Sequence, residues 1–118
     1  MIYLSGNHPF IQLRVKIPKT GWKKLDCLID TGFSGGIALP KNFRQNFSED
    51  KFIESRFTLA DGSEMMTDVT YTKVEYDGKE KEVAIVFIGD LGCLVGVEFL
   101  DQMKFCLDLK AKKATLSI

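Results

Sequence analysis

Residues 27–36 read CLIDTGFSGG, an apolar run that ends in an acid and then passes into small residues. The spacing of Leu25, Cys27 and Ile29 predicts a β-strand that carries these side chains on one face. Such a strand would present the carboxylate of Asp30 at its end. Apolar residues before the acid and small residues after it suit a reacting carboxylate, because backbone N–H groups and a second chain can approach it closely.

The same residues also fit a structural turn. Asp and Thr after a strand commonly bond to their own backbone, and Gly follows in such turns. An Asp-Thr-Gly string occurs by chance in roughly two per cent of chains of this length. The triplet Asp30-Thr31-Gly32 alone therefore leaves two interpretations open, a catalytic acid and a structural turn.

Period-two patterns dominate the rest of the chain. They predict hairpins and paired strands over residues 10–17 and 22–29, 52–59 and 65–76, 81–88, 105–109 and 114–118, with Asp-Gly turns at residues 61–62 and 77–78. Residues 97–103 give the best helix pattern, and residues 40–47 suit one or two helical turns. The sequence therefore predicts an all-β fold, a closed β-barrel or sandwich with one short helix near the C-terminus, formed by residues 1–118 as a single domain.

Composition and charge indicate a folded globular protein without a strong net charge. The 118 residues are 45% hydrophobic, which is typical of a folded globular chain. Sixteen basic residues balance sixteen acidic ones, so the charge gives no reason to expect nucleic acid or an acidic membrane surface as a partner. The N-terminal residues do not form a signal-peptide pattern, and no run is long and apolar enough to span a bilayer. A cytoplasmic protein is the resulting expectation.

Cysteine and histidine usage excludes several kinds of site. The chain has three cysteines: Cys27, Cys93 and Cys106. An odd number of cysteines without C-x-x-C spacing argues against a disulfide framework and against a zinc site. All three lie among apolar neighbours, so we expect them to be buried. His8 is the one histidine and has no acid or Cys partner at useful spacing, so a Ser or Cys hydrolase triad lacks its base. Neither a metal nor a cofactor is expected.

The order of these features resembles that of the retropepsin-like aspartic proteases, in particular their small bacterial single-domain type. In that family an apolar strand enters Asp-Thr-Gly, as residues 28–32 do here, and a flap hairpin follows, here residues 57–64. Two apolar residues and a Gly then lead into a short helix, here Leu94-Val95-Gly96 before residues 97–100. A final strand pair ends the domain, here residues 105–118.

One residue departs from the family pattern. Other members usually carry Ala or Ser directly after Asp-Thr-Gly, whereas this chain carries Phe33. A hydroxyl at this position could donate to the catalytic carboxylate, and Phe33 can offer only its backbone N–H. Its side chain suits a substrate pocket and simple packing under the loop equally well.

The resemblance implies an aspartic endopeptidase that acts on peptide or protein substrates as a homodimer. It places Asp30, Thr31 and Gly32 in the catalytic loop, with two Asp30 carboxylates sharing one proton and activating water. It further implies substrate-binding residues (Phe33, Ser34, Ala60, Asp61 and Gly62) and residues that support the loop (Leu94, Val95 and Gly96). Two alternatives stay open: a non-catalytic dimerisation or peptide-binding module with the same fold, and an unrelated small β-barrel.

Overall fold

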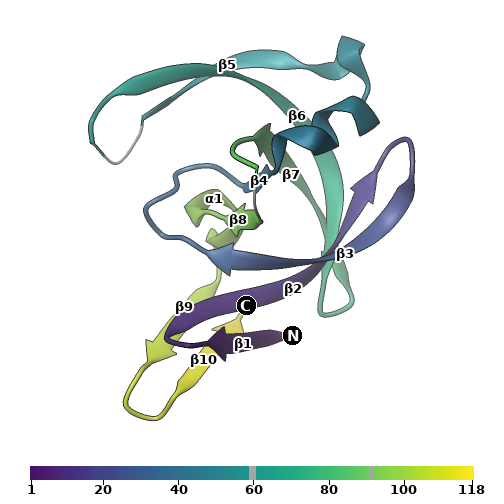
Figure 1. The fold of residues 1–118 in the computed structure, drawn as a ribbon. Coiled ribbons are helices and arrows are strands. Elements are labelled where there is room, and N and C mark those ends of the chain that lie inside the picture. The colour runs from purple at the N-terminus through teal and green to yellow at the C-terminus, as the bar shows by residue number, and fades with distance from the viewer. Residues whose placement is uncertain (59–60, 91) are drawn as a thin grey trace.

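The computed structural model describes residues 1–58, 61–90 and 92–118 (Figure 1). Within these ranges the strands are β1 (Ile2–Ser5), β2 (His8–Ile17), β3 (Gly21–Ile29), β4 (Ile37–Leu39), β5 (Ile53–Thr58), β6 (Glu64–Tyr76), β7 (Lys79–Phe87), β8 (Cys93–Val95), β9 (Lys104–Asp108) and β10 (Lys113–Ser117). The helices are η1 (Lys41–Asn46) and η2 (Glu49–Lys51), both 3-10, and α1 (Val97–Leu100). The prediction of a mostly β fold is confirmed.

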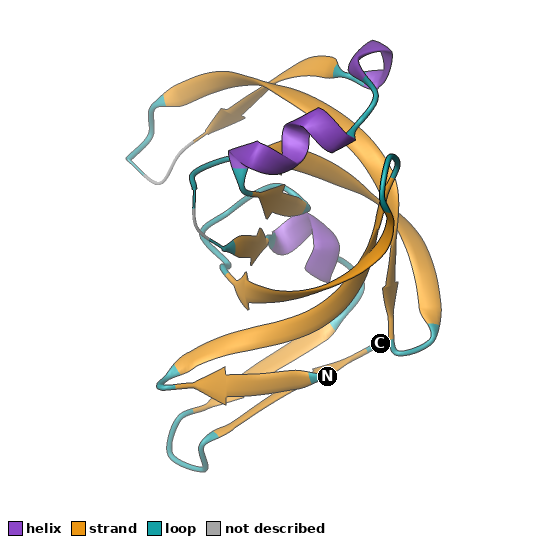
Figure 2. Cartoon of the chain, turned by 45° about the vertical axis from the view of Figure 1, so that its right-hand side comes forward, coloured by secondary structure: helices purple, strands orange, loops and turns teal. Residues whose placement is uncertain are grey.

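Eight of the strands form one sheet in the order β1-β2-β3-β8-β4-β7-β6-β5. An additional pairing joins β2 to β6 through Arg14↔Glu75 and Val15↔Val74, so the sheet curls round its apolar interior. β9 and β10 pair with each other in a separate sheet that lies beside β1 (Figures 1 and 2). The short strands β8 and β4 occupy the middle of the large sheet, and the candidate site is built on them.

The alternating pattern of β2 forms one wall of the core. Ile11, Leu13, Val15 and Ile17 are buried, while the polar residues between them face outward, as the period of two requires. The opposite walls of the core come from large apolar side chains just after η1, on the central strands and on α1: Phe47, Ile85, Val95 and Phe99. Burial of each such side chain stabilises the fold by about 1.5–3 kcal/mol.

The Asp-Gly turn at residues 77–78 forms as the sequence predicts. Asp77 and Gly78 join β6 to β7 and have φ angles of 52° and 76°. Both lie in the left-handed region that a two-residue I′ hairpin turn needs, which explains why Asp-Gly stands there.

Two predictions are wrong, and the short elements β1, β4, β8 and η2 are not predicted. The helix ends at Leu100 and not at Met103, because the backbone of Asp101 leaves the helical region (ψ 135°) and Gln102 is left-handed (φ 67°). Cys106 is exposed, since its side chain lies on the outer face of the β9–β10 pair. The N-terminal strand β1 pairs with β2 although no strand was predicted there. None of the helices in the described residues has the length and apolar character needed to cross a bilayer.

Candidate active site

Asp30 follows the last residue of β3 and is fixed by its backbone and by its side chain. Its N–H donates to the carbonyl oxygen of Val95 (2.9 Å), and its Oδ1 accepts a hydrogen bond from the N–H of Gly32 (2.9 Å). The side chain is half-buried, whereas Thr31 and Gly32 are exposed. Within the described part of the chain, Oδ2 has no hydrogen-bond partner. The loop therefore presents one carboxylate oxygen that the turn does not use.

Backbone hydrogen bonds from β8 and α1 hold the loop from behind. The N–H of Gly96 donates to the carbonyl of Gly36 (2.8 Å), that of Val97 to Phe33 (3.0 Å) and that of Glu98 to Gly35 (3.2 Å). β8 lies between β3 and β4 in the sheet, so it contacts both ends of the loop. The loop is thus attached to a buried strand and not merely anchored at its own ends.

The three predicted support residues lie in this arrangement. Val95 is fully buried and accepts the bond from Asp30, and Leu94 is half-buried on the opposite face of β8. Gly96 packs so closely that a Cβ there would lie less than 3.0 Å from the carbonyl oxygens of Gly35 and Phe33. Only glycine fits this position, because the loop backbone occupies the space of any side chain.

Phe33 packs beneath the loop. Together with Phe57, Ile88 and Leu94 it covers a small apolar cluster formed by Ala38, Val69, Ala84 and Val86. The rings of Phe33 and Phe57 both reach the space in front of Gly35, where a Cβ would clash with Phe33. Because Phe57 belongs to β5, this cluster joins the loop to the β5–β6 hairpin. Ser34, the next predicted substrate-binding residue, is exposed.

The hairpin of β5 and β6 projects on the same side of the molecule as the loop between β3 and β4 (Figure 1). In its turn, Oδ1 of Asp61 accepts hydrogen bonds from the backbone N–H (2.9 Å) and the hydroxyl (2.5 Å) of Ser63. These bonds hold the pKa of Asp61 below its usual value. Gly62 has a φ of 86°, which favours glycine. The predicted flap residue Ala60 lies outside the described residues.

An anchor at the base of this hairpin was not predicted from the sequence. Arg44 on η1 donates to Oδ2 of Asp68 on β6 (2.7 Å) and to Oε1 of Glu49 (2.6 Å), and its guanidinium lies 4.4 Å from the centre of the Phe52 ring. The two carboxylates raise the pKa of Arg44. No local signal marks this group, because its members meet only through the tertiary fold.

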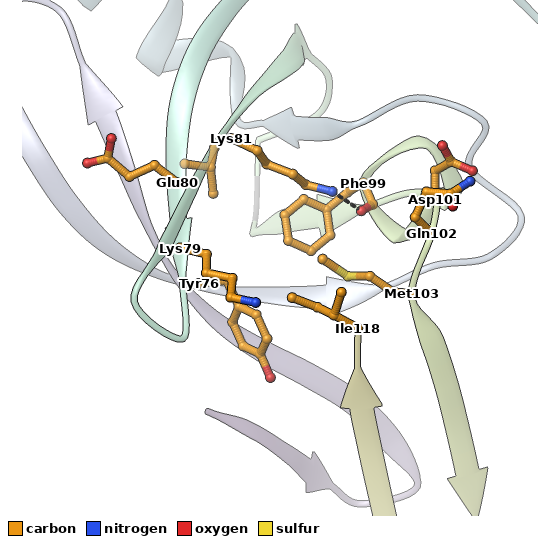
Figure 3. A pocket seen from close by; sticks show the side chains of 10 residues that line it. Tyr76, Lys79, Glu80, Lys81, Phe99, Asp101, Gln102, Met103 and Ile118 are labelled. Atoms are coloured by element: carbon orange, nitrogen blue, oxygen red, sulfur yellow. Dashed lines mark hydrogen bonds between the residues drawn. The ribbon is translucent and has the colours of Figure 1, made fainter.

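A separate apolar cavity of about 230 Å³ contains none of the predicted site residues. Figure 3 shows Tyr76, Phe99, Met103 and Ile118 around it, with the ammonium group of Lys81 donating to the carbonyl oxygen of Phe99. Burial lowers the pKa of Lys81. The candidate site is the face between the Asp30 loop and the hairpin, because the predicted site residues that the structure describes lie there and none of them lines this cavity.

A solved structure matches this arrangement over most of its length. The crystal structure of a retropepsin-like aspartic protease from Rickettsia conorii is 26% identical, with a TM-score of 0.58, and the match covers 94% of this chain and 85% of that one. The fold is retropepsin-like. No protein-family model and no curated protein sequence matches the chain.

The retropepsin-like fold accounts for the order of elements round Asp30. The acid directly follows one strand, a hairpin projects beside it, and a buried strand followed by a short helix holds the loop from behind, in the order that the sequence resemblance implied. The fold alone does not fix activity, because one architecture serves both enzymes and binding modules.

Proposed function

We propose that the protein is an aspartic endopeptidase that acts as a homodimer. The observation that carries the proposal is the position of Asp30 in a retropepsin-like fold: it is fixed by hydrogen bonds to Val95 and Gly32, and Oδ2 is left without a partner in the described residues. A fixed carboxylate costs little reorganisation when it reacts, which favours catalysis.

A second copy of the chain would supply the second carboxylate. Asp30 is the one acid of this sequence in an Asp-Thr-Gly triplet, and the exposed Thr31 and Gly32 leave room for a twofold-related loop to approach. Two carboxylates at close range share one proton, because both cannot be charged cheaply. The ionised one would take a proton from water as it attacks the peptide carbonyl. The other would donate its proton to the carbonyl oxygen, and the leaving amine would be protonated later.

The peptide would lie between the loop and the β5–β6 hairpin. Phe33 and Ser34 would line it on the loop side, and Ala60, Asp61 and Gly62 on the hairpin side, with main-chain hydrogen bonds to an extended substrate. Leu94, Val95 and Gly96 would keep the loop in place. The large sheet behind the site would close into a barrel, since β2 pairs with both β3 and β6.

The variant Asp30→Asn tests the assignment. The amide oxygen of Asn can still accept from the N–H of Gly32, so we expect the fold to be unchanged. Cleavage of a peptide library at mildly acidic pH should fall by about 10³-fold or more, as it does when an essential group is removed. Asp26→Asn is the matched control, because Asp26 is an exposed acid on β3, and it should cleave like the parent. Equal cleavage by Asp30→Asn and the parent would show that Asp30 is not catalytic.

The same experiment separates the enzyme from the binding module. Peptide binding is measured in parallel, by fluorescence anisotropy with labelled peptides. An enzyme should cleave the peptides that it binds, and Asp30→Asn should bind them intact. A parent protein that binds peptides as a folded dimer and cleaves none would support the non-catalytic module instead.

A further inference from the structure

Two buried cysteines face each other directly beneath the Asp30 loop. Cys27 on β3 and Cys93 on β8 are register partners in the parallel pair of these strands, and both are free thiols. Cys27 is fully buried and Cys93 is 7% exposed, and both belong to the main apolar core. The two cysteines are neighbours only because β3 and β8, which are distant in the sequence, lie side by side. The spacing of the cysteines along the chain could not show this.

The register of the two strands meets the Cα-spacing condition for a disulfide between Cys27 and Cys93. Neighbouring strands lie about 4.8 Å apart, and a disulfide needs Cα atoms roughly 4.4–6.8 Å apart. Register partners also point to the same face of the sheet. Hydrogen bonding between the two thiols raises the pKa of Cys27 and, with the charge of Lys23, lowers that of Cys93. Within this pair, Cys93 is therefore the thiol that ionises first, and it is also the less buried of the two.

We propose that Cys27 and Cys93 form an intrachain disulfide when the protein meets a small oxidant such as hydrogen peroxide. The sulfur of Cys93 attacks one peroxide oxygen, the O–O bond breaks, and sulfenic acid and water form. The sulfur of Cys27 then attacks the sulfur of Cys93, the S–O bond breaks, and a second water leaves. Two thiols are oxidised and one peroxide is reduced to two water molecules.

The bond would connect the two strands that determine the position of the loop. Asp30 lies three residues after Cys27, and Gly96 lies three residues after Cys93. The hydrogen bond from the N–H of Asp30 to the carbonyl oxygen of Val95 already joins these two strands next to the loop. A disulfide here closes a long loop of chain, so it should stabilise the folded state and suppress separation of β3 from β8.

The test is made on the purified full chain treated with hydrogen peroxide and then digested without reduction. We expect a linked pair of peptides containing Cys27 and Cys93, a mass of that pair lower by two hydrogen atoms than the sum of the two free peptides, and a melting temperature higher by on the order of 10 °C. A thiol reductant should reverse all three changes. Cys106→Ser should behave like the parent, because Cys106 is exposed on β9 and lies outside the pair.

Three results would overturn the inference: thiols at Cys27 and Cys93 that stay free, oxygen added to either sulfur without a crosslink, or a crosslink that involves Cys106. Cys93→Ser should lose the thermal shift, and peptide mapping of the parent gives the answer even if that variant folds poorly. The proposal does not rest on the peptidase assignment. Asp30→Asn should form the same disulfide, so failure of one proposal does not imply failure of the other.

Discussion

Asp30 uses its two carboxylate oxygens differently. Oδ1 closes the turn by accepting from Gly32, a role that Asn would fill equally well. Oδ2 takes no part in that turn. A purely structural turn does not require an acid at this position, whereas proton exchange with water does. This is why Asp30→Asn can separate the structure of the loop from its chemistry.

Gly96 is the residue at which the loop is most sensitive to substitution. Gly96→Ala would place a Cβ against the carbonyl oxygens of Gly35 and Phe33, which are backbone atoms that cannot rotate away. We expect the free energy of unfolding to fall by about 3 kcal/mol, the upper range for overpacking a closed site. Urea denaturation measures it, and the slope of the transition should stay unchanged if only the folded state is affected.

Gly32→Ala is the matched comparison. A Cβ at Gly32 meets one atom, Oδ1 of Asp30 at 3.2 Å, on the exposed side of the loop. Its cost in stability should be clearly smaller than that of Gly96→Ala. Similar losses for both variants would mean that β8 and α1 do not support the loop as the hydrogen bonds indicate.

At the scale of elements, the β5–β6 hairpin depends on η1 for its position. Arg44 joins η1 to Asp68 at the base of the hairpin and also holds Glu49 and the Phe52 ring. Arg44→Met keeps the apolar stem and removes the donors. We expect backbone amides of β5 and β6 to exchange with deuterium several-fold faster, because a weakened anchor lets the hairpin open more often. Native-state hydrogen exchange followed by mass spectrometry measures this.

Arg14→Met serves as the control for the hairpin. It breaks an ion pair of the same kind, Arg14 with Glu75, which joins β2 to β6 at the other end of the long strand. In this variant, amides near the Arg14–Glu75 pair should exchange faster, whereas the amides of the β5–β6 hairpin should exchange at the parent rate. If Arg14→Met mobilises the hairpin as much as Arg44→Met, the anchor at η1 has no specific role.

The elements differ in how far the sequence predicts them. Alternation in β2 and the Asp-Gly turn of residues 77–78 are local signals, and both elements form as predicted. The hydrogen bonds from β8 and α1 to the loop join residues sixty or more positions apart, so no local pattern could show them. The same reason applies to the Arg44 anchor. Cys106 was expected to be buried because its neighbours are apolar, but strand alternation turns it outward.

At the scale of the whole molecule, one chain offers one candidate acid. The proposed reaction needs two carboxylates, so each subunit alone should be inactive. The formal net charge is zero, so no long-range repulsion opposes association of two copies. An isologous twofold contact would bring the exposed Thr31 and Gly32 of each copy together.

Mixing two kinds of chain tests whether activity belongs to the pair. Asp30→Asn protein is added to an equal amount of parent and allowed to exchange subunits. If a dimer needs two intact acids and subunits pair at random, the cleavage rate should fall to about half that of the same amount of parent alone, since mixed dimers are inactive. Asp26→Asn should leave the rate at or above the parent value. A rate unaffected by added Asp30→Asn, in a mixture where mass spectrometry detects mixed dimers, would mean that a single acid suffices and that the shared-proton mechanism is wrong.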